Sequence, residues 1–143
     1  MIRVRRARRL SPSTPSRTAS LTATTNGNTI DRQGYGLADF VIQVGTSTTA
    51  DGSNFFTLSL EHGDASNMSD AAAVTAANGL VGANLVINAT ADANLVNHLG
   101  YNGIKRYVRV VATETGTASV QMAGVCILSD AARQPASNTA IAS

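Results

Sequence analysis

Apolar and polar residues alternate along much of this chain with the period of a β-strand, and turn residues separate the alternating stretches. From residue 55 to residue 62, Phe56, Leu58 and Leu60 alternate with polar side chains, which predicts a strand with one buried face. Residues 37–44 are largely apolar, which predicts a strand that is buried on both faces or begins a sandwich. Further strands are predicted at residues 80–90 with a break at Gly82, at residues 104–114 and at residues 118–128.

Turn signals separate these stretches. Asp51-Gly52 marks a turn before residue 55, residues 63–69 read as a loop, and residues 115–117 form a short hairpin loop. The Ala-rich residues 71–77, followed by Asn78-Gly79, predict one or two turns of helix. Short strands at regular spacing with turns between them predict an all-β fold, either an antiparallel β-sandwich or a jelly-roll-like domain.

The alternation also predicts the core and a partly covered surface. Seven residues share an inward register: Phe40, Ile42, Phe56, Leu58, Val108, Val110 and Cys126. Cys126 is the only cysteine, so it forms no intrachain disulfide and is expected to be a small buried hydrophobe. Only 14% of the residues are charged, against about 25% in a typical domain. This predicts a surface covered in an assembly; a soluble Thr- and Asn-rich β-domain is the alternative.

Charge divides the chain into a basic start and an acidic remainder. Six cations lie in the first 17 residues, and no acid precedes Asp31. They are Arg3, Arg5, Arg6, Arg8, Arg9 and Arg17. The other five cations face all nine acids, a net charge of −4. Residues 1–33 are therefore predicted to be an extended, Ser/Thr-rich arm that docks on an acidic partner, residues 34–135 the β-sandwich body and residues 136–143 a flexible tail. The alternative is a basic tail without a partner.

Residues 100–111 combine a turn between glycines with a strand dense in cations. In the alternation, Lys105, Tyr107 and Arg109 point one way. Arg and Tyr are favoured interface anchors, so these three are predicted to bind a partner or a second copy that supplies carboxylates. Arg106 is expected at the strand end with its head group in solvent.

No set of residues completes a catalytic or metal site. The two histidines, His62 and His98, have neither a second cysteine nor a paired histidine at zinc spacing. Residues 62–66 contain the residue types of a hydrolytic triad, but adjacent residues do not align their side chains in a relay. Asp64, Asn67 and Asp70 lack the glycine and terminal Glu of a calcium loop. We therefore expect a protein that is not an enzyme and has no cofactor or metal.

Membrane insertion and secretion are also not expected. No apolar run approaches the roughly 18 residues of a membrane helix. The basic N-terminus has no apolar region of a secretory signal, and although its composition is similar to that of an organelle transit peptide, the rest of the chain does not favour one.

Several segments together resemble a family of small structural proteins of tailed bacteriophages. The segment Gly100-Tyr101-Asn102-Gly103 followed by Lys105-Arg106-Tyr107-Val108-Arg109-Val110 is similar to a turn and strand of that family. The earlier matches are Gly34-Tyr35-Gly36 with its apolar strand and the Phe- and Leu-rich residues 55–62. The apolar residues 125–128 followed by Arg133-Gln134-Pro135 match near the end. The resemblance covers roughly residues 34–135, without residues 70–93.

The resemblance implies a virion protein that decorates or cements the capsid, or a minor head protein. The implied partner is the major capsid protein, and the implied assembly is a homo-oligomer, with a trimer favoured, built into the phage capsid in the bacterial cytoplasm. The arm is then expected to dock on capsid protein in preference to packaged nucleic acid. A tail-tube, neck or head-fibre subunit is the alternative within the virion. A carbohydrate-binding β-sandwich module is a second alternative, which the absence of Trp disfavours.

Overall fold

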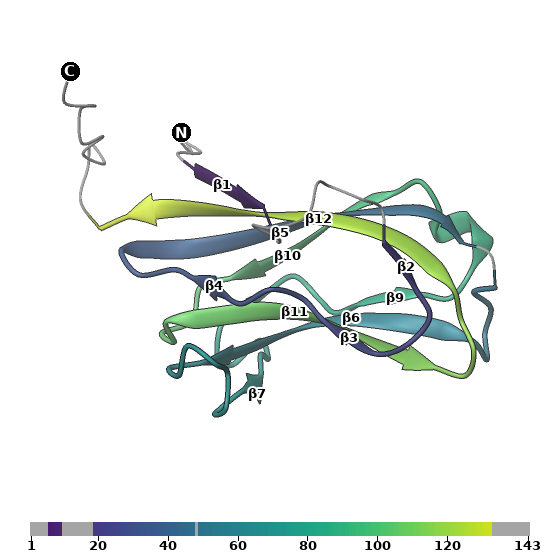
Figure 1. Ribbon diagram of the computed structural model, residues 1–143. Helices are drawn as coiled ribbons and strands as arrows, with labels where there is room; N and C mark the ends of the chain where they lie inside the picture. Colours follow the sequence, from purple (N-terminus) through teal and green to yellow (C-terminus); the bar gives the residue numbers. More distant parts are fainter. Residues whose placement is uncertain (1–5, 10–18, 48, 133–143) are drawn as a thin grey trace, which may run out of the picture.

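Two antiparallel sheets packed face to face make up the described part of the chain, residues 6–9, 19–47 and 49–132 of a computed structural model (Figure 1). Sheet A contains β1 (Arg6–Arg9), β2 (Ala19–Leu21), β5 (Tyr35–Ser47), β8 (Leu80–Val81), β10 (Val96–Tyr101) and β12 (Val120–Ala131). Sheet B contains β3 (Thr25–Asn26), β4 (Ile30–Asp31), β6 (Phe55–Gly63), β7 (Ala72–Ala73), β9 (Leu85–Ile87) and β11 (Tyr107–Thr115). A single 3-10 turn, η1 (Thr90–Asp92), leads to β10. The all-β sandwich expected from the alternation is confirmed.

Each sheet is built around two long antiparallel strands. In sheet A, β12 pairs with β5, and β10 and then β8 follow on the far side of β5. In sheet B, β11 pairs with β6 over the whole of both strands. Short strands complete the edges: β1 and β2 lie along β12, β3 and β4 along β11, and β7 and β9 along β6.

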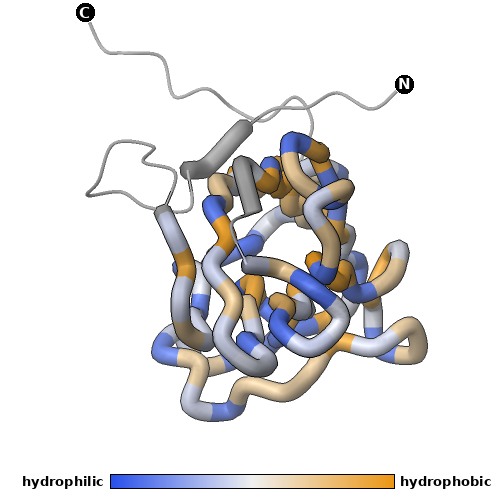
Figure 2. Tube along the Cα trace, turned by 90° about the vertical axis from the view of Figure 1, so that its right-hand side faces the viewer, coloured by the Kyte–Doolittle hydropathy of each residue, from blue (hydrophilic) through white to orange (hydrophobic). Residues whose placement is uncertain are grey.

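The core lies between the two sheets and follows the predicted inward register. All seven residues expected there belong to one buried cluster. In β6, buried and half-buried positions alternate from residue 55 to residue 62, and Figure 2 shows the changes of hydropathy along the strands. Burial raises the pKa of the Cys126 thiol to about 12, so this thiol is protonated at neutral pH.

The first described residues of the body close one side of the sandwich. The chain leaves sheet A after β2, crosses to sheet B, and pairs with β11 through β3 and β4. Ile30 enters the core with 3% of its surface exposed, and Arg32 is also buried. Residues 19–32, which the Ser/Thr-rich composition assigned to the arm, therefore belong to the body. Strand pairing and one buried aliphatic residue outweigh their polar composition.

Residues 72–101 close the opposite side, and here the predicted helix is wrong. Ala72 and Ala73 form β7 at the edge of β6, opposite His62 and Glu61. The turn that follows is held by the Asn78 side chain, whose oxygen accepts the Thr75 N–H. Edge pairing thus overrides the helix propensity of alanine. The break predicted at Gly82 is present, with φ +96, and it separates β8 in sheet A from β9 in sheet B.

Candidate functional site

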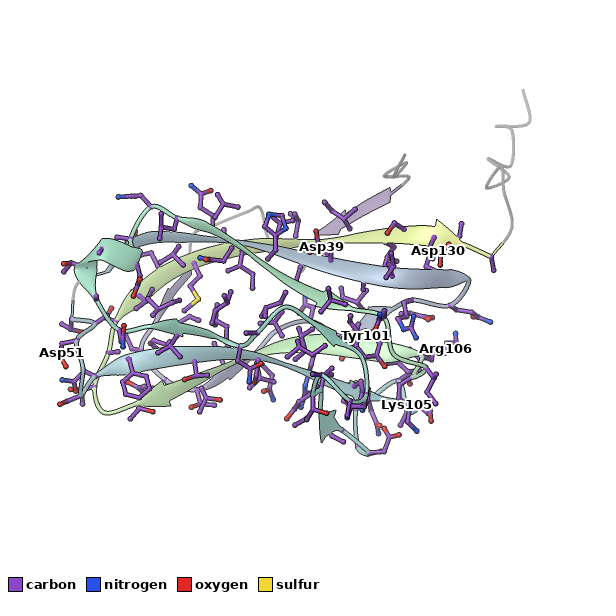
Figure 3. The ribbon with its side chains drawn as sticks, turned by 180° about the vertical axis from the view of Figure 1, so that it is seen from behind. Asp39, Asp51, Tyr101, Lys105, Arg106 and Asp130 are labelled. Atoms are coloured by element: carbon purple, nitrogen blue, oxygen red, sulfur yellow. The ribbon has the colours of Figure 1, made fainter. Side chains whose placement is uncertain are left out.

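Tyr101 anchors the Gly-bounded turn that the sequence singled out. Its side chain is completely buried at the end of β10, at the end of the sandwich that also carries Lys105 and Arg106 (Figure 3). The Tyr101 hydroxyl accepts the backbone N–H of Lys105 at 3.0 Å and lies 2.8 Å from His62 Nδ1. A Cβ atom at Gly103 would collide with this hydroxyl and with the Asn78 carbonyl oxygen, so only glycine fits the turn.

Arg32 ties the same turn to the start of β5. Its guanidinium is 4.7 Å from the centre of the Tyr101 ring. It donates to the carbonyl oxygens of Lys105 at 2.6 Å, Tyr35 and Gly36 at 3.0 Å, and Gly103. The planar fork of donors makes Arg suited to join several carbonyl groups of two loops at one point.

His62 lies beside this group with 6% of its surface exposed. Burial lowers the pKa of His62, and the nearby Lys105 and Arg32 cations lower it further, while Asp64 and Asp70 oppose them. A neutral imidazole can accept the Tyr101 hydroxyl proton at Nδ1. Burial raises the pKa of the Tyr101 hydroxyl, so both groups remain uncharged near neutral pH. The hydrogen bond between His62 and Tyr101 therefore joins β6 to β10 and serves as a structural contact between the two sheets.

Carboxylates of the same chain neutralise the cations of residues 105–109. Lys105 Nζ is 2.6 Å from an Asp64 oxygen, and this contact lowers the pKa of Asp64 and raises that of Lys105. Arg106 binds both oxygens of Asp31 and lies over the Tyr107 ring, 5.1 Å from its centre. On the sheet, Arg109 binds Glu61, with Nη2 at 2.7 Å from the carboxylate. The Arg109–Glu61 pair lies on the outer surface of sheet B, and the pairs of Lys105 and Arg106 lie at the end of the sandwich (Figure 3).

The ion pairs within the chain correct part of the reasoning that predicted an interface at Lys105, Tyr107 and Arg109. The strand begins at Tyr107, so Lys105 lies in the preceding loop and Arg106 is ion-paired, not free in solvent. Carboxylates from a second copy are not needed to neutralise the cluster. Tyr107 and Arg109 do share the outer face, opposite Gly63 and Glu61. A partner-binding role for Lys105, Tyr107 and Arg109 stays a prediction.

The outer face of sheet A has a different chemistry, because half-buried aliphatic side chains lie on it and no element of the described part of the chain packs over them. Register and burial place the following residues on this face: Leu37 and Val41 from β5, Val96 from β10, and Val125 and Ile127 from β12. Val41 and Val125 are direct cross-strand partners, and Val96 is 57% exposed. Asp39 lies on the same face (Figure 3), 3.1 Å from His98 Nδ1. The outer face of sheet B carries Thr57, Ser59, Thr113 and the Glu61–Arg109 pair. Register places two valines on it as well, Val111 opposite Ser59 and the 47% exposed Val86 opposite Thr57.

A basic strand borders this aliphatic face. β1 pairs antiparallel with β12, from Arg6 opposite Leu128 to Arg9 opposite Val125. Three of the predicted arm residues, Arg6, Arg8 and Arg9, therefore lie in a strand at the edge of sheet A. Arg3, Arg5 and Arg17 lie outside the described residues.

The weaker chemical candidates of the sequence do not assemble into a site. His62 contacts Tyr101, while the Asp70 carboxylate accepts the backbone N–H groups of Asp64 and Ala65. The acidic residues at positions 64 and 70 are therefore part of a loop that the Asp70 carboxylate holds together. In the described ranges, no group of three His, Cys, Asp or Glu side chains is placed to hold a metal ion.

The aliphatic outer face was not predicted, although its signal was present in the sequence. Residues 37–44 read as one apolar run, which was interpreted as burial on both faces or the start of a sandwich. The inner half of that run enters the core, and the outer half, with Leu37 and Val41, lies on the uncovered face. Only the register with β12 shows that Val125 and Ile127 extend the same surface.

Neither a protein-family model nor a curated protein matches this chain. Over the described residues, no helix has the length and apolar character required to cross a membrane.

Proposed function

We propose that this chain is a non-enzymatic virion structural protein of a tailed bacteriophage, which decorates or cements the capsid by binding major capsid protein subunits. It would act in the phage capsid after assembly in the bacterial cytoplasm. The resemblance of residues 34–135 to small phage structural proteins is one support. The observation that carries the proposal is the aliphatic outer face of sheet A, over which no described element packs, bordered by the basic strand β1.

The aliphatic face provides the contact area that a cement protein needs. Apolar side chains that lie together on a sheet surface gain free energy when another protein removes them from water. Leu37, Val41 and Val125 are aligned on the two longest strands of sheet A, so their backbones are held rigidly and little conformational entropy is lost on binding.

Charge supplies the second part of the proposed contact. Residues 1–17 carry six arginines, and the remainder of the chain has a net charge of −4. Arginine binds carboxylates with two parallel hydrogen bonds, so the arm fits an acidic capsid surface beside the sheet. Many weak contacts of this kind, repeated by capsid symmetry, hold a seam with high avidity.

The test is co-sedimentation of the purified protein with expanded capsids assembled from the major capsid protein of the same phage. Val41→Lys places a charge on the outer face of sheet A, and binding should fall at least tenfold, a loss of about 1.4 kcal/mol. Thr57→Lys is the matched control, because Thr57 occupies a central strand on the outer face of sheet B. It should bind capsids as the native chain does.

Two results would contradict this proposal. Equal capsid binding by the native chain and the Val41→Lys variant would remove sheet A from the contact. Absence of capsid binding by the native chain, combined with its presence as a ring in purified tails or necks, would favour the alternative of a tail-tube or neck subunit.

A further inference from the structure

The strands β1 and β2 occupy the same edge of β12 and run in the same direction. Both pair antiparallel with β12, with Arg9 opposite Val125 and Ala19 opposite Met122. Only Ala123 and Gly124 of β12 lie between the two paired stretches. A continuous edge strand would therefore need two residues at this point, whereas the sequence has nine, residues 10–18.

This link is much longer than pairing within one chain requires. The step from Val125 to Met122 along β12 is about 10 Å at roughly 3.4 Å per residue. Nine residues and their flanking bonds can span up to roughly 30 Å when extended. The chain between β1 and β2 is thus long enough for β1 to reach a neighbouring molecule while β2 stays on its own sheet.

We propose that β1 is exchanged between copies of this chain, so that the β1 strand of one copy pairs with the 125–128 edge of β12 in the next copy. The occupant of this edge is the same four residues, Arg6–Arg9, in both arrangements. The backbone hydrogen bonds are therefore identical, and exchange loses no strand pairing. The basic strand also moves from its own acidic body to another body of the same charge, so charge complementarity is kept.

Strand exchange gives the homo-oligomer of the proposed function a physical basis. Head-to-tail exchange closes into a ring when the rotation allows it, and three copies give the expected trimer. Each β12 edge stays covered, as it is by β1 of the same chain, so exchange joins the subunits without exposing a strand edge. Strand exchange itself is tested on purified protein without capsids. Only the biological role of the resulting oligomer rests on the proposed function.

The native Cys126 provides a direct test, since residue 8 lies opposite Cys126 in the β1–β12 register. Antiparallel partners have Cα atoms about 4.5–5.5 Å apart, within the range of a disulfide. Oxidation of the Arg8→Cys variant with copper phenanthroline should give covalent dimers or trimers on a non-reducing gel. Arg9→Cys is the matched control: residue 9 lies opposite Val125 and on the other face of the strand, so this variant should form no disulfide with Cys126 and should run as a single chain on the same denaturing gel.

Light scattering after size exclusion gives an independent readout. The native chain should be an oligomer, and a variant in which residues 10–18 are shortened to two residues should be a monomer, because β1 and β2 then form one continuous strand. Replacing residues 10–18 by nine Gly and Ser residues keeps the length and should keep the oligomer.

An intrachain disulfide in monomeric Arg8→Cys protein overturns the proposal, as does a monomeric native chain or an unchanged oligomer in the shortened variant. If Cys126 is not oxidised in either cysteine variant, the light-scattering result decides. Strand exchange without capsid binding would uphold this inference and contradict the proposed function. Capsid binding by a chain that does not exchange β1 would uphold the proposed function and contradict this inference.

Discussion

Arg32 is the residue on which the end of the sandwich depends most, because one buried guanidinium joins three separate segments. It donates to carbonyl oxygens at the start of β5 and in the loop before β11, and it lies over the buried Tyr101 ring. These hydrogen bonds are partly buried, so water reaches the carbonyl groups less freely than it does at the surface. Removing the guanidinium leaves them without a donor, which costs free energy for each buried group.

We predict that Arg32→Met lowers the free energy of unfolding by about 3 kcal/mol or more. Methionine keeps the apolar stem and removes all the donors of the side chain. The measurement is urea unfolding followed by circular dichroism. Arg106→Met is the matched control, because Arg106 pairs with Asp31 at the surface, and its loss of stability should be much smaller. Equal losses in the two variants would contradict the role of Arg32.

His62 makes stability depend on pH in a defined window. Its pKa in the folded protein is lowered, chiefly by burial, while the unfolded chain keeps a value of about 6.5. The unfolded state therefore binds the proton first as the pH falls. Stability is fully present above about pH 6.5 and declines below it until folded His62 is also protonated. The acidic residues whose pKa is lowered change their protonation, and with it the stability, only at lower pH, near and below about 4.

We predict that the urea midpoint falls between pH 7 and about pH 5 in the native chain, and that this fall is reduced in His62→Gln. His98→Gln serves as the control, since His98 is on the outer face of sheet A; this variant should keep the decline. A His62→Gln protein with the full native pH dependence would show that another group is responsible.

Single core residues were predictable, and the residues that hold the turn were not. The positions of Phe56, Leu58 and Val108 follow from alternation alone, because a strand with one buried face leaves a period of two in the sequence. Tyr101 and Arg32 leave no such signal. Their hydrogen bonds join residues 62, 101 and 105, and such contacts depend on the register between strands from distant parts of the chain.

Among the elements, long strands were predicted well and short edge segments poorly. β6 alternates over eight of its nine residues and β11 over its first four. β3 and β4 have two residues each, too few to show a period. Residues 19–32 were therefore placed in the arm, and Ala72–Ala73 in a helix. In both cases pairing to a long neighbouring strand, which is a tertiary interaction, determined the local structure.

We predict that Val108→Asp prevents folding, because it buries an unpaired carboxylate at a position with no exposed surface, at a cost of several kcal/mol, roughly 3 or more. Thr113→Asp, at an exposed position of the same strand, should leave the protein folded. Circular dichroism and proteolysis distinguish the two variants. Normally folded Val108→Asp protein would contradict the assignment of β11 to the core.

At the scale of the whole molecule, the two outer faces of the sandwich differ in chemistry. Sheet A presents aliphatic side chains on its two longest strands, bordered by a basic strand. Sheet B presents more polar groups, namely hydroxyl groups and a Glu61–Arg109 ion pair, together with Val86 and Val111. The sequence showed the split of charge and the low charged fraction, but not which face is apolar. That distinction requires the pairing of β5 with β12, whose residues are about eighty positions apart.

We predict that capsid attachment weakens as salt is added, because exposed ion pairs between the arm and the capsid are screened. Deleting residues 1–17, which carry six of the 11 cations, should leave the body folded, weaken attachment at low salt and reduce the salt dependence. Co-sedimentation over a salt series measures both. Equal low-salt binding by the truncated and full-length chains would exclude the arm from docking.

A cryo-electron microscopy reconstruction of capsids decorated with this protein would test most directly whether sheet A binds the capsid shell. We predict density for the sandwich on the outer shell across seams between major capsid protein subunits. Sheet A, with Val41, Val125 and Ile127, should face the shell, and Thr57 and Arg109 of sheet B should face solvent. Density with sheet B against the shell, or in a ring of the neck or tail, would contradict it.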